Sequence, residues 1–211
     1  MLWCGMYKQL KAAMLAGLAG VCCLFFVLVP GALAADVSYA AGEMALGDKA
    51  APVKVIEYAS MTCPHCAHFA KDTFDDFKAK YIDTGKVYFI FREFPLDRLA
   101  FQASKVARCS GAERFWPMIS VLFAQQAQWV PADDPIVALK KIGRLAGLSS
   151  EQVDACLEDK QLADLILANR LKGEKDDNVE STPSFVVNGK THAGDMSLTE
   201  FDKLLAPYLT K

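Results

Sequence analysis

Two cysteines, Cys63 and Cys66, enclose a proline and a histidine in the order Cys-Pro-His-Cys. Thiols at this spacing lie one helical turn apart, and a pair of this kind can do thiol-disulfide exchange, in which a thiolate attacks a sulfur of a disulfide. The alternative is a structural staple. A disulfide across so short a loop removes little chain entropy, so the spacing favours a redox pair.

The residues on either side of Cys63 predict that it starts a helix. Residues 53–58 are β-branched and mostly apolar, which predicts a strand just before the pair. Pro64 suits the first turn of a helix, where backbone N–H groups have no partner. Those N–H groups and the positive end of the helix dipole are expected to lower the pKa of Cys63. His65, protonated or as an N–H donor, is expected to stabilise the same sulfur; the alternative is an exposed turn residue.

Glu57 is the acidic residue of the predicted strand before the pair. We expect it to point beneath the disulfide. A buried carboxyl has a raised pKa, and it can relay a proton to or from Cys66, the sulfur expected to be more buried. The alternative is a glutamate at the end of a strand that faces solvent.

The N-terminal segment has the pattern of an export signal. Lys8 and Lys11 precede an apolar run over residues 12–29, and Ala32-Leu33-Ala34 is a small-x-small cleavage site. These features predict a secretory signal peptide over residues 1–34, and hence a periplasmic protein. An uncleaved membrane anchor is the alternative, because the run is just long enough to span a bilayer. With 23 Lys and Arg against 25 Asp and Glu, the net charge of −2 does not support nucleic-acid binding.

The cysteines outside this segment are even in number, which fits an oxidising compartment. They are Cys63, Cys66, Cys109 and Cys156. We expect a structural disulfide between Cys109 and Cys156, because an exported protein rarely keeps unpaired thiols. Two buried free thiols or a regulatory switch are the alternatives.

The order of the predicted elements indicates an α/β domain over residues 51–211. Residues 35–50 have no apolar period and are expected to be a flexible lead-in. Ala70, Phe74, Phe77 and Tyr81 share one helical face after the cysteine pair, and residues 87–92 predict a second strand. Strand, helix and strand with short connections imply a parallel βαβ unit. Cys63 then lies at the carboxyl end of a strand, where α/β proteins place their sites.

The second half of the chain predicts helices and then a hairpin. The pattern is helical in an insertion over about residues 98–178, and Gly111 and Gly147 are expected at helix ends. Helix starts are indicated by Asp134 before a proline and by a capping box from Ser149. Residues 184–193 predict a β-hairpin around Asn-Gly, followed by a last amphipathic helix.

This order resembles a thioredoxin fold with a helical insertion, and the chain is similar to the DsbA family. The matching pieces are the Cys63 to Cys66 motif, residues 91–96 and residues 182–189. The resemblance implies a thioredoxin-like α/β fold and protein disulfide oxidoreductase activity, with no cofactor. It also implies a cis bond before Pro183, which lays the backbone of Thr182 beside Cys63, where an extended substrate can pair with it.

The resemblance further implies how the residues act. A substrate thiolate attacks the oxidised pair and forms a mixed disulfide with Cys63, and a second substrate thiolate resolves it. Cys63 is therefore expected to be the exposed partner, and Cys66 resolves the mixed disulfide in the reverse direction. Glu57 is expected to pair with a lysine, for which Lys86 is the candidate.

The expected function is that of a periplasmic oxidase. Its substrates are unfolded exported polypeptides, and a DsbB-like membrane partner re-oxidises it. A disulfide isomerase or reductase of the same fold is the alternative, since threonine before the cis-proline occurs in both. A copper- or other metal-binding protein is the alternative of a different class, because His65 and His68 accompany the two thiols; a structural zinc site would want a second ligand pair, and only His192 is left over.

Overall fold

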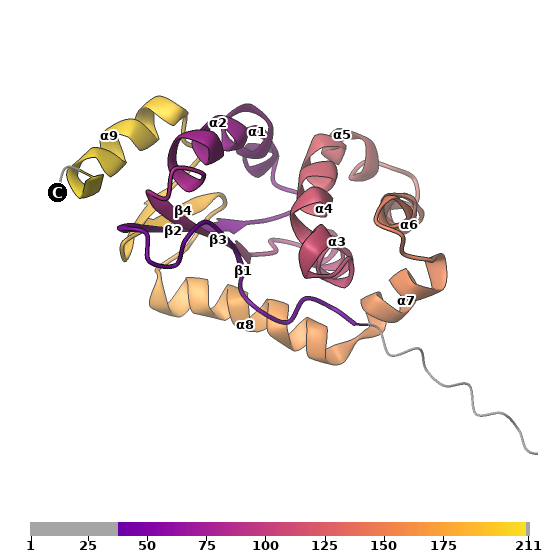
Figure 1. Cartoon of the computed structure of the whole chain (residues 1–211). Coiled ribbons are helices and arrows are strands. Elements are labelled where there is room, and N and C mark those ends of the chain that lie inside the picture. The colour runs from indigo at the N-terminus through magenta and orange to yellow at the C-terminus, as the bar shows by residue number, and fades with distance from the viewer. Residues whose placement is uncertain (1–37, 210–211) are drawn as a thin grey trace, which may run out of the picture. The chain divides into compact units, whose positions relative to one another are not determined.

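The computed structural model describes residues 38–209 of the chain (Figure 1). The signal peptide or anchor expected at residues 1–34 lies outside the described residues. Among the helices formed by residues 38–209, none has the length and apolar character to span a membrane.

Strands of the described region form one mixed sheet in the order β1-β3-β2-β4-β5. Their bounds are β1 Met44–Leu46, β2 Val53–Ala59, β3 Val87–Glu93, β4 Ser184–Val187 and β5 Lys190–Ala193. The pair β2 and β3 is parallel and the other neighbours are antiparallel. The expected βαβ unit and hairpin are therefore confirmed. Asn188 and Gly189 both have positive φ, at 45° and 86°, as a type I′ turn requires.

Helices pack on both faces of the sheet and form the insertion (Figure 1). On one face lie α1 Pro64–Asp72, α2 Phe74–Phe77, the π-helix η1 Lys78–Ile82 and α9 Leu198–Leu209. The insertion contains α3 Arg98–Cys109, α4 Ala112–Ala124, α5 Gln126–Trp129, α6 Pro135–Leu145, α7 Ser150–Glu158 and α8 Lys160–Asp176. Asp134 caps α6, and Ser149 and Gln152 form the capping box of α7, so the predicted helix starts are confirmed.

Residues 38–50 correct one expectation, because they are not a flexible lead-in. Met44 is buried in β1, which pairs with β3, and the backbone N–H of Ala40 donates to the carbonyl oxygen of Arg108 at 3.0 Å. A short edge strand is held by backbone hydrogen bonds. Its side chains therefore need not show the apolar period on which the expectation depended.

Contacts between aromatic side chains fix the position of α1 on the sheet. Phe69 of α1 lies 4.7 Å from Phe185 of β4 and 5.8 Å from Phe201 of α9, measured between ring centroids. All three side chains are fully buried. Such contacts add to the free energy of burying the rings and fix how one element lies on another. The N-terminus of α1 is thereby held beside the segment that leads into β4.

A disulfide joins two helices within the insertion, and a buried charged cluster joins the insertion to the sheet. Cys109 of α3 and Cys156 of α7 form a disulfide over a sequence separation of 47, which stabilises by roughly 4 kcal/mol in the chain-entropy model. Arg108 of α3 makes two hydrogen bonds to Glu93 of β3, at 2.5 and 2.9 Å, and both side chains are buried. Asn169 of α8 donates to the same carboxylate at 2.7 Å. This buried cluster connects three elements at the insertion's base.

Candidate active site

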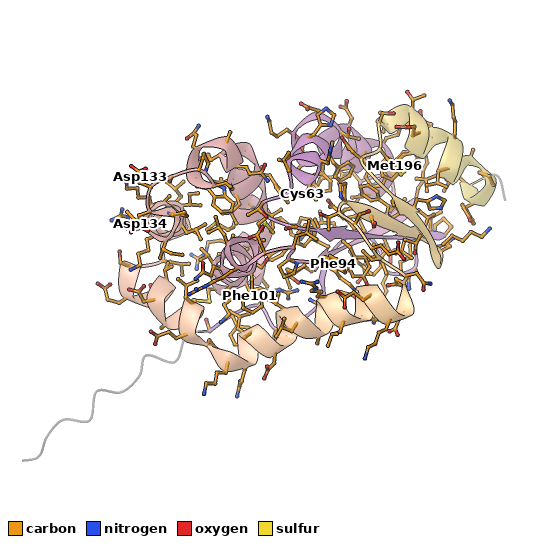
Figure 2. All side chains as sticks on the ribbon, turned by 180° about the vertical axis from the view of Figure 1, so that it is seen from behind. Cys63, Phe94, Phe101, Asp133, Asp134 and Met196 are labelled. Carbon is orange, nitrogen blue, oxygen red and sulfur yellow. A yellow bond between two sulfur atoms is a disulfide. The ribbon has the colours of Figure 1, made fainter. Side chains whose placement is uncertain are left out.

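Cys63 is the N-cap residue of α1, and Pro64 occupies the first turn (Figure 2). Both cysteines of the motif are free thiols in this structure. The exposed fraction is 7% for Cys63 and 0% for Cys66. Cys63 is therefore the more accessible sulfur, but the expectation that it is exposed is wrong. Segments distant in the sequence cover it.

One of these segments is the turn before β4. The peptide bond between Thr182 and Pro183 is cis, and both residues are buried. The thiol of Cys63 donates to the backbone carbonyl oxygen of Thr182 at 3.2 Å. The hydroxyl oxygen of Thr182 is buried without a hydrogen-bond partner, so it is free to donate to a Cys63 thiolate.

The helical insertion supplies the second segment. The buried amide of Gln126 donates to the carbonyl oxygens of Met61 at 2.8 Å and Cys63 at 3.0 Å. These bonds hold the loop that carries Cys63 against α5. Sequence reasoning missed Gln126, because a glutamine in a helical stretch carries no local signature of a contact this far along the chain.

The surroundings of Cys63 favour its thiolate. A hydrogen bond from the Cys66 thiol has the largest effect, and together with the Thr182 side chain and the backbone N–H groups of Cys66 and His65 it lowers the pKa of Cys63 to about 5. Burial opposes this shift but does not cancel it. At neutral pH the reduced protein therefore carries a nucleophilic thiolate at Cys63.

His65 acts differently from the expectation. Its side chain is exposed to solvent. The backbone N–H of His65, at the start of α1, is the part of this residue that contributes to lowering the pKa of Cys63. The helix terminus therefore does what we expected of the imidazole.

The pKa of Cys66 shifts in the opposite direction to that of Cys63. Burial is the largest cause that raises the pKa of its thiol far above the ordinary range, followed by the hydrogen bond with Cys63 and the negative charges of Glu57 and Cys63. The reduced pair therefore consists of one thiolate and one thiol. Each time the disulfide is reduced, one proton must reach the buried sulfur of Cys66.

Glu57 lies beneath the pair on β2, flanked by Phe91 of β3 and Phe185 of β4. Its side chain is buried, and Oε1 has no hydrogen-bond partner. Burial, then the charges of Asp195 and Cys63, raises the pKa of Glu57 to about 8. At neutral pH it is mostly a protonated acid, and it lies close enough to Cys66 for its charge to affect the pKa of that thiol.

The prediction that Lys86 pairs with Glu57 is wrong. Lys86 is exposed, and its carbonyl oxygen accepts from Val53 at the opposite end of β2. In the parallel register of β2 and β3 the partner of Glu57 is Phe91, five residues beyond Lys86 along the strand, which places the lysine well beyond hydrogen-bond reach.

His68, which the metal-binding alternative counted as a possible ligand, contacts two carboxylates instead. Nδ1 of His68 lies 2.5 Å from Asp195 and Nε2 lies 3.3 Å from Asp72. Within residues 38–209, no group of three or more histidine, cysteine and carboxylate side chains is placed to hold a metal ion.

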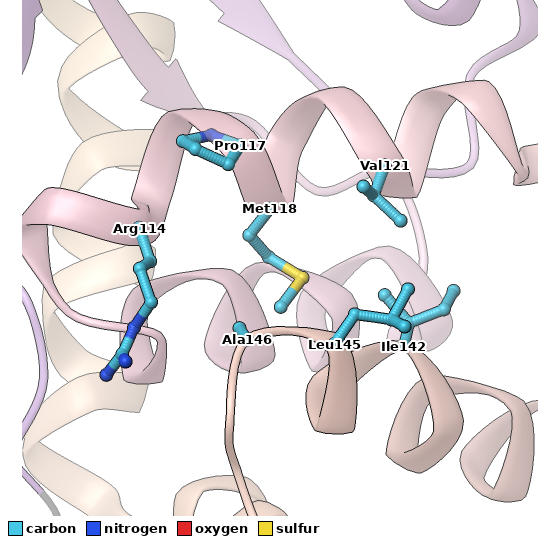
Figure 3. Close-up of a pocket in the computed structure, with 7 residues that line it drawn as sticks. All are labelled: Arg114, Pro117, Met118, Val121, Ile142, Leu145 and Ala146. Carbon is cyan, nitrogen blue, oxygen red and sulfur yellow. The ribbon is translucent and has the colours of Figure 1, made fainter.

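A separate apolar groove lies in the insertion, between α4 and α6 (Figure 3). Met118, Val121, Ile142 and Leu145 line it, with Arg114 at one end. None of the residues around Cys63 belongs to it, so the groove is not part of the candidate active site.

The titration of Cys63 provides a first test. We expect the thiolate absorbance near 240 nm, or the alkylation rate, to change with a midpoint near pH 5. Because the Cys66 thiol is the main donor to Cys63, Cys66→Ala should raise that midpoint clearly, and Cys66→Ser, which keeps a donor, should raise it less. A midpoint near the ordinary value of about 8.5 in the unaltered protein would contradict this account of the site.

Comparisons with known proteins agree with this geometry. The model of the thioredoxin family Thioredoxin_4 matches residues 40–206. A crystal structure of alpha-DsbA1 from Wolbachia pipientis is similar with a TM-score of 0.73 and 30% identity, covering 80% of this chain and 91% of that one. A protein-disulfide isomerase from Novosphingobium aromaticivorans has a TM-score of 0.70 over 81% of this chain and 98% of that chain, but at 24% identity it shows the fold alone.

A curated relative extends the comparison. It is a provisionally named protein-disulfide oxidoreductase of Rickettsia conorii, 36% identical over 168 residues, and the match covers 77% of this chain. The chain spans 60% of the length of that relative.

Proposed function

Since the chain belongs to the DsbA group of the thioredoxin family, we propose that it is a protein disulfide oxidoreductase that introduces disulfide bonds into exported proteins. Cys63 is its nucleophile and Cys66 its buried partner. The observation that carries the proposal is the contrast between the two sulfurs: folding lowers the pKa of one thiol to about 5 and raises the pKa of the other.

The proposed reaction transfers two electrons from the substrate to the protein. A substrate thiolate attacks Cys63 in the oxidised pair, the bond between Cys63 and Cys66 breaks, and Cys66 leaves as a thiolate that takes up a proton. A second substrate thiolate then attacks the substrate sulfur of the mixed disulfide, and Cys63 leaves as a stable thiolate. The substrate gains a disulfide and the protein is left reduced.

The low pKa of Cys63 determines the proposed direction. A stable thiolate stabilises the reduced form, which makes the disulfide a stronger oxidant by roughly 30 mV for each unit of pKa. This supports an oxidase over an isomerase or reductase, which has to remain reduced. The backbone of Thr182, beside Cys63, is the proposed site where an extended substrate pairs with the protein.

The proposed location is the periplasm. The signal-like residues 1–34 support export, and the disulfide between Cys109 and Cys156 fits an oxidising compartment. The substrates would be unfolded exported polypeptides. Because each turnover leaves the pair reduced, an oxidant must accept two electrons from it, and we propose a membrane partner similar to DsbB.

The stability of the two redox forms tests the direction. We expect the reduced protein to unfold at a higher temperature than the oxidised protein at pH 8, since only the reduced form contains the stabilised thiolate. Folding lowers the pKa of Cys63 from about 8.5 to about 5, so its contribution is present above the unfolded value and is lost as the pH falls through the folded one.

The advantage of the reduced form should therefore shrink between pH 8 and pH 5. Glu57 is present in both forms, and comparing the two removes the part of its pH dependence that burial and Asp195 cause, though not the smaller part that the Cys63 charge causes. Thermal unfolding followed by circular dichroism, with and without reductant, measures the difference. A lower midpoint for the reduced form at pH 8 would favour the isomerase or reductase instead.

A further inference from the structure

Unpaired buried polar atoms gather at the cysteine pair. Within residues 38–209, the buried side-chain polar atoms without a hydrogen-bond partner belong to Glu57, Thr182, His192 and Asp195. Buried polar groups in folded proteins are normally bonded to protein atoms or to internal water, so a concentration of exceptions at one place calls for a functional reason. The Thr182 hydroxyl is accounted for by the Cys63 thiolate. The other three are not.

These three lie together below α1. Glu57 and His192 occupy the same row of the sheet, on either side of Phe185, and therefore share its face. Asp195 follows β5, and its charge is close enough to raise the pKa of Glu57. Met196, the next residue, is partly buried against the core cluster that includes Phe69 of α1.

Asp195 and His68 lead from this place to solvent. Oδ2 of Asp195 lies 2.5 Å from Nδ1 of His68. The side chain of Asp195 is 20% exposed and that of His68 is 61% exposed. Oδ1, the other oxygen of Asp195, is the buried unpaired atom. Asp195 therefore has one oxygen bonded to an exposed imidazole and the other turned into the protein.

We propose that Asp195 and His68 form a proton route that connects Glu57 with solvent and supplies the proton taken up by Cys66. This inference rests on the proposed function. Reduction of the disulfide leaves the Cys66 sulfur as a thiolate; Glu57, as the acid, gives it a proton and becomes a carboxylate. A proton from His68 then reaches Glu57 through Asp195 and internal water, and solvent reprotonates His68. Re-oxidation runs the same steps backwards.

The titratable groups around this route come from α1, β5 and the segment before α9. Cys63 and Cys66 at the start of α1 and Asp195 of the segment before α9 interact with Glu57, and His192 of β5 lies beyond Phe185 on the same face of the sheet. His68 faces Asp195 and, through its other nitrogen, Asp72. Asp72 is more than half exposed, so it is a surface partner of His68 that the route does not need.

The test is the rate at which the oxidised full-length protein is reduced by a cysteine-containing peptide, followed by stopped-flow tryptophan fluorescence at pH 8 in weak buffer. His68→Ala should slow the reaction about a hundredfold, the lower end of the range that positioned proton transfer contributes. Added imidazole should restore the rate in proportion to its concentration, which a structural defect would not allow. Asp195→Asn should slow the reaction similarly.

Asp72→Asn is the matched control, because it removes the other carboxylate bonded to His68, and it should leave the rate unchanged. The Cys63 titration should stay near pH 5 in all variants. The route is overturned if His68→Ala reacts at the original rate, or if its loss of rate is not restored by imidazole. The proposed function would survive either result, whereas it would fail if the unaltered protein did not react at all.

Discussion

Replacing Cys63 with alanine is expected to abolish thiol-disulfide exchange, lowering the rate of dithiol oxidation by at least about a thousandfold, the scale on which loss of a nucleophile acts. Cys63 is the one of the two motif sulfurs that is ionised at neutral pH and that retains any exposure. Cys66 cannot replace it, because its thiol is buried and its pKa is raised. The oxidation of a reduced, unfolded peptide containing two cysteines measures the effect.

Cys66→Ser is the matched control for this prediction. It leaves the nucleophile in place but removes the sulfur that releases the substrate in the reverse direction. When it is mixed with an activated disulfide peptide, a covalent adduct through Cys63 should accumulate and be visible by mass spectrometry. Adduct formation by Cys63→Ala, or none by Cys66→Ser, would count against exchange through Cys63.

Replacing Arg108 with methionine is expected to destabilise the fold by about 3–5 kcal/mol, the cost of leaving a buried charge without its partner. The side chain of Arg108 is 1% exposed and that of Glu93 is fully buried. Arg108 also donates to the carbonyl oxygens of Ala40 and Gly42, at 2.8 and 2.6 Å, so the substitution releases the N-terminal edge of the sheet as well. Denaturant unfolding of the oxidised protein measures the change.

Two further variants show whether the ion pair is the cause. Arg98→Met removes an exposed arginine from the same helix and should change the free energy of unfolding by no more than about 0.5 kcal/mol. The double variant of Arg108→Met with Glu93→Gln should lose less than the sum of its single changes, because the unpaired charge is gone. A cost below about 1 kcal/mol for Arg108→Met alone would show that the cluster does not stabilise the fold.

The sequence alone predicted the elements with local signals. The hairpin at residues 184–193 was predicted by an Asn-Gly turn, and the start of α6 by an aspartate before a proline. The two reactive cysteines were also evident, since their spacing and Pro64 place them at a helix start. These features depend on neighbours a few residues apart, and short-range sterics and hydrogen bonding set them.

Three predictions made from local sequence patterns are wrong. The three-residue strand β1 was taken as a lead-in, because an edge strand held by its backbone needs no apolar period. Lys86 was taken as the partner of Glu57, although the strand register separates them. His65 was expected to act through its ring, whereas its backbone N–H acts on Cys63.

The electrostatics of the site depend on contacts between distant parts of the chain. Cys63 donates a hydrogen bond to Thr182, which lies 119 positions along the chain. The side chain of Gln126, 63 positions from Cys63, donates to the Cys63 carbonyl oxygen. Asp195 approaches Glu57 only because β5 completes the sheet next to β4. Residue types and spacing along the chain therefore indicate which sulfurs can react and which fold presents them. The groups that tune these sulfurs are known only from the folded chain, because charge interactions and hydrogen bonds depend on distances that folding sets.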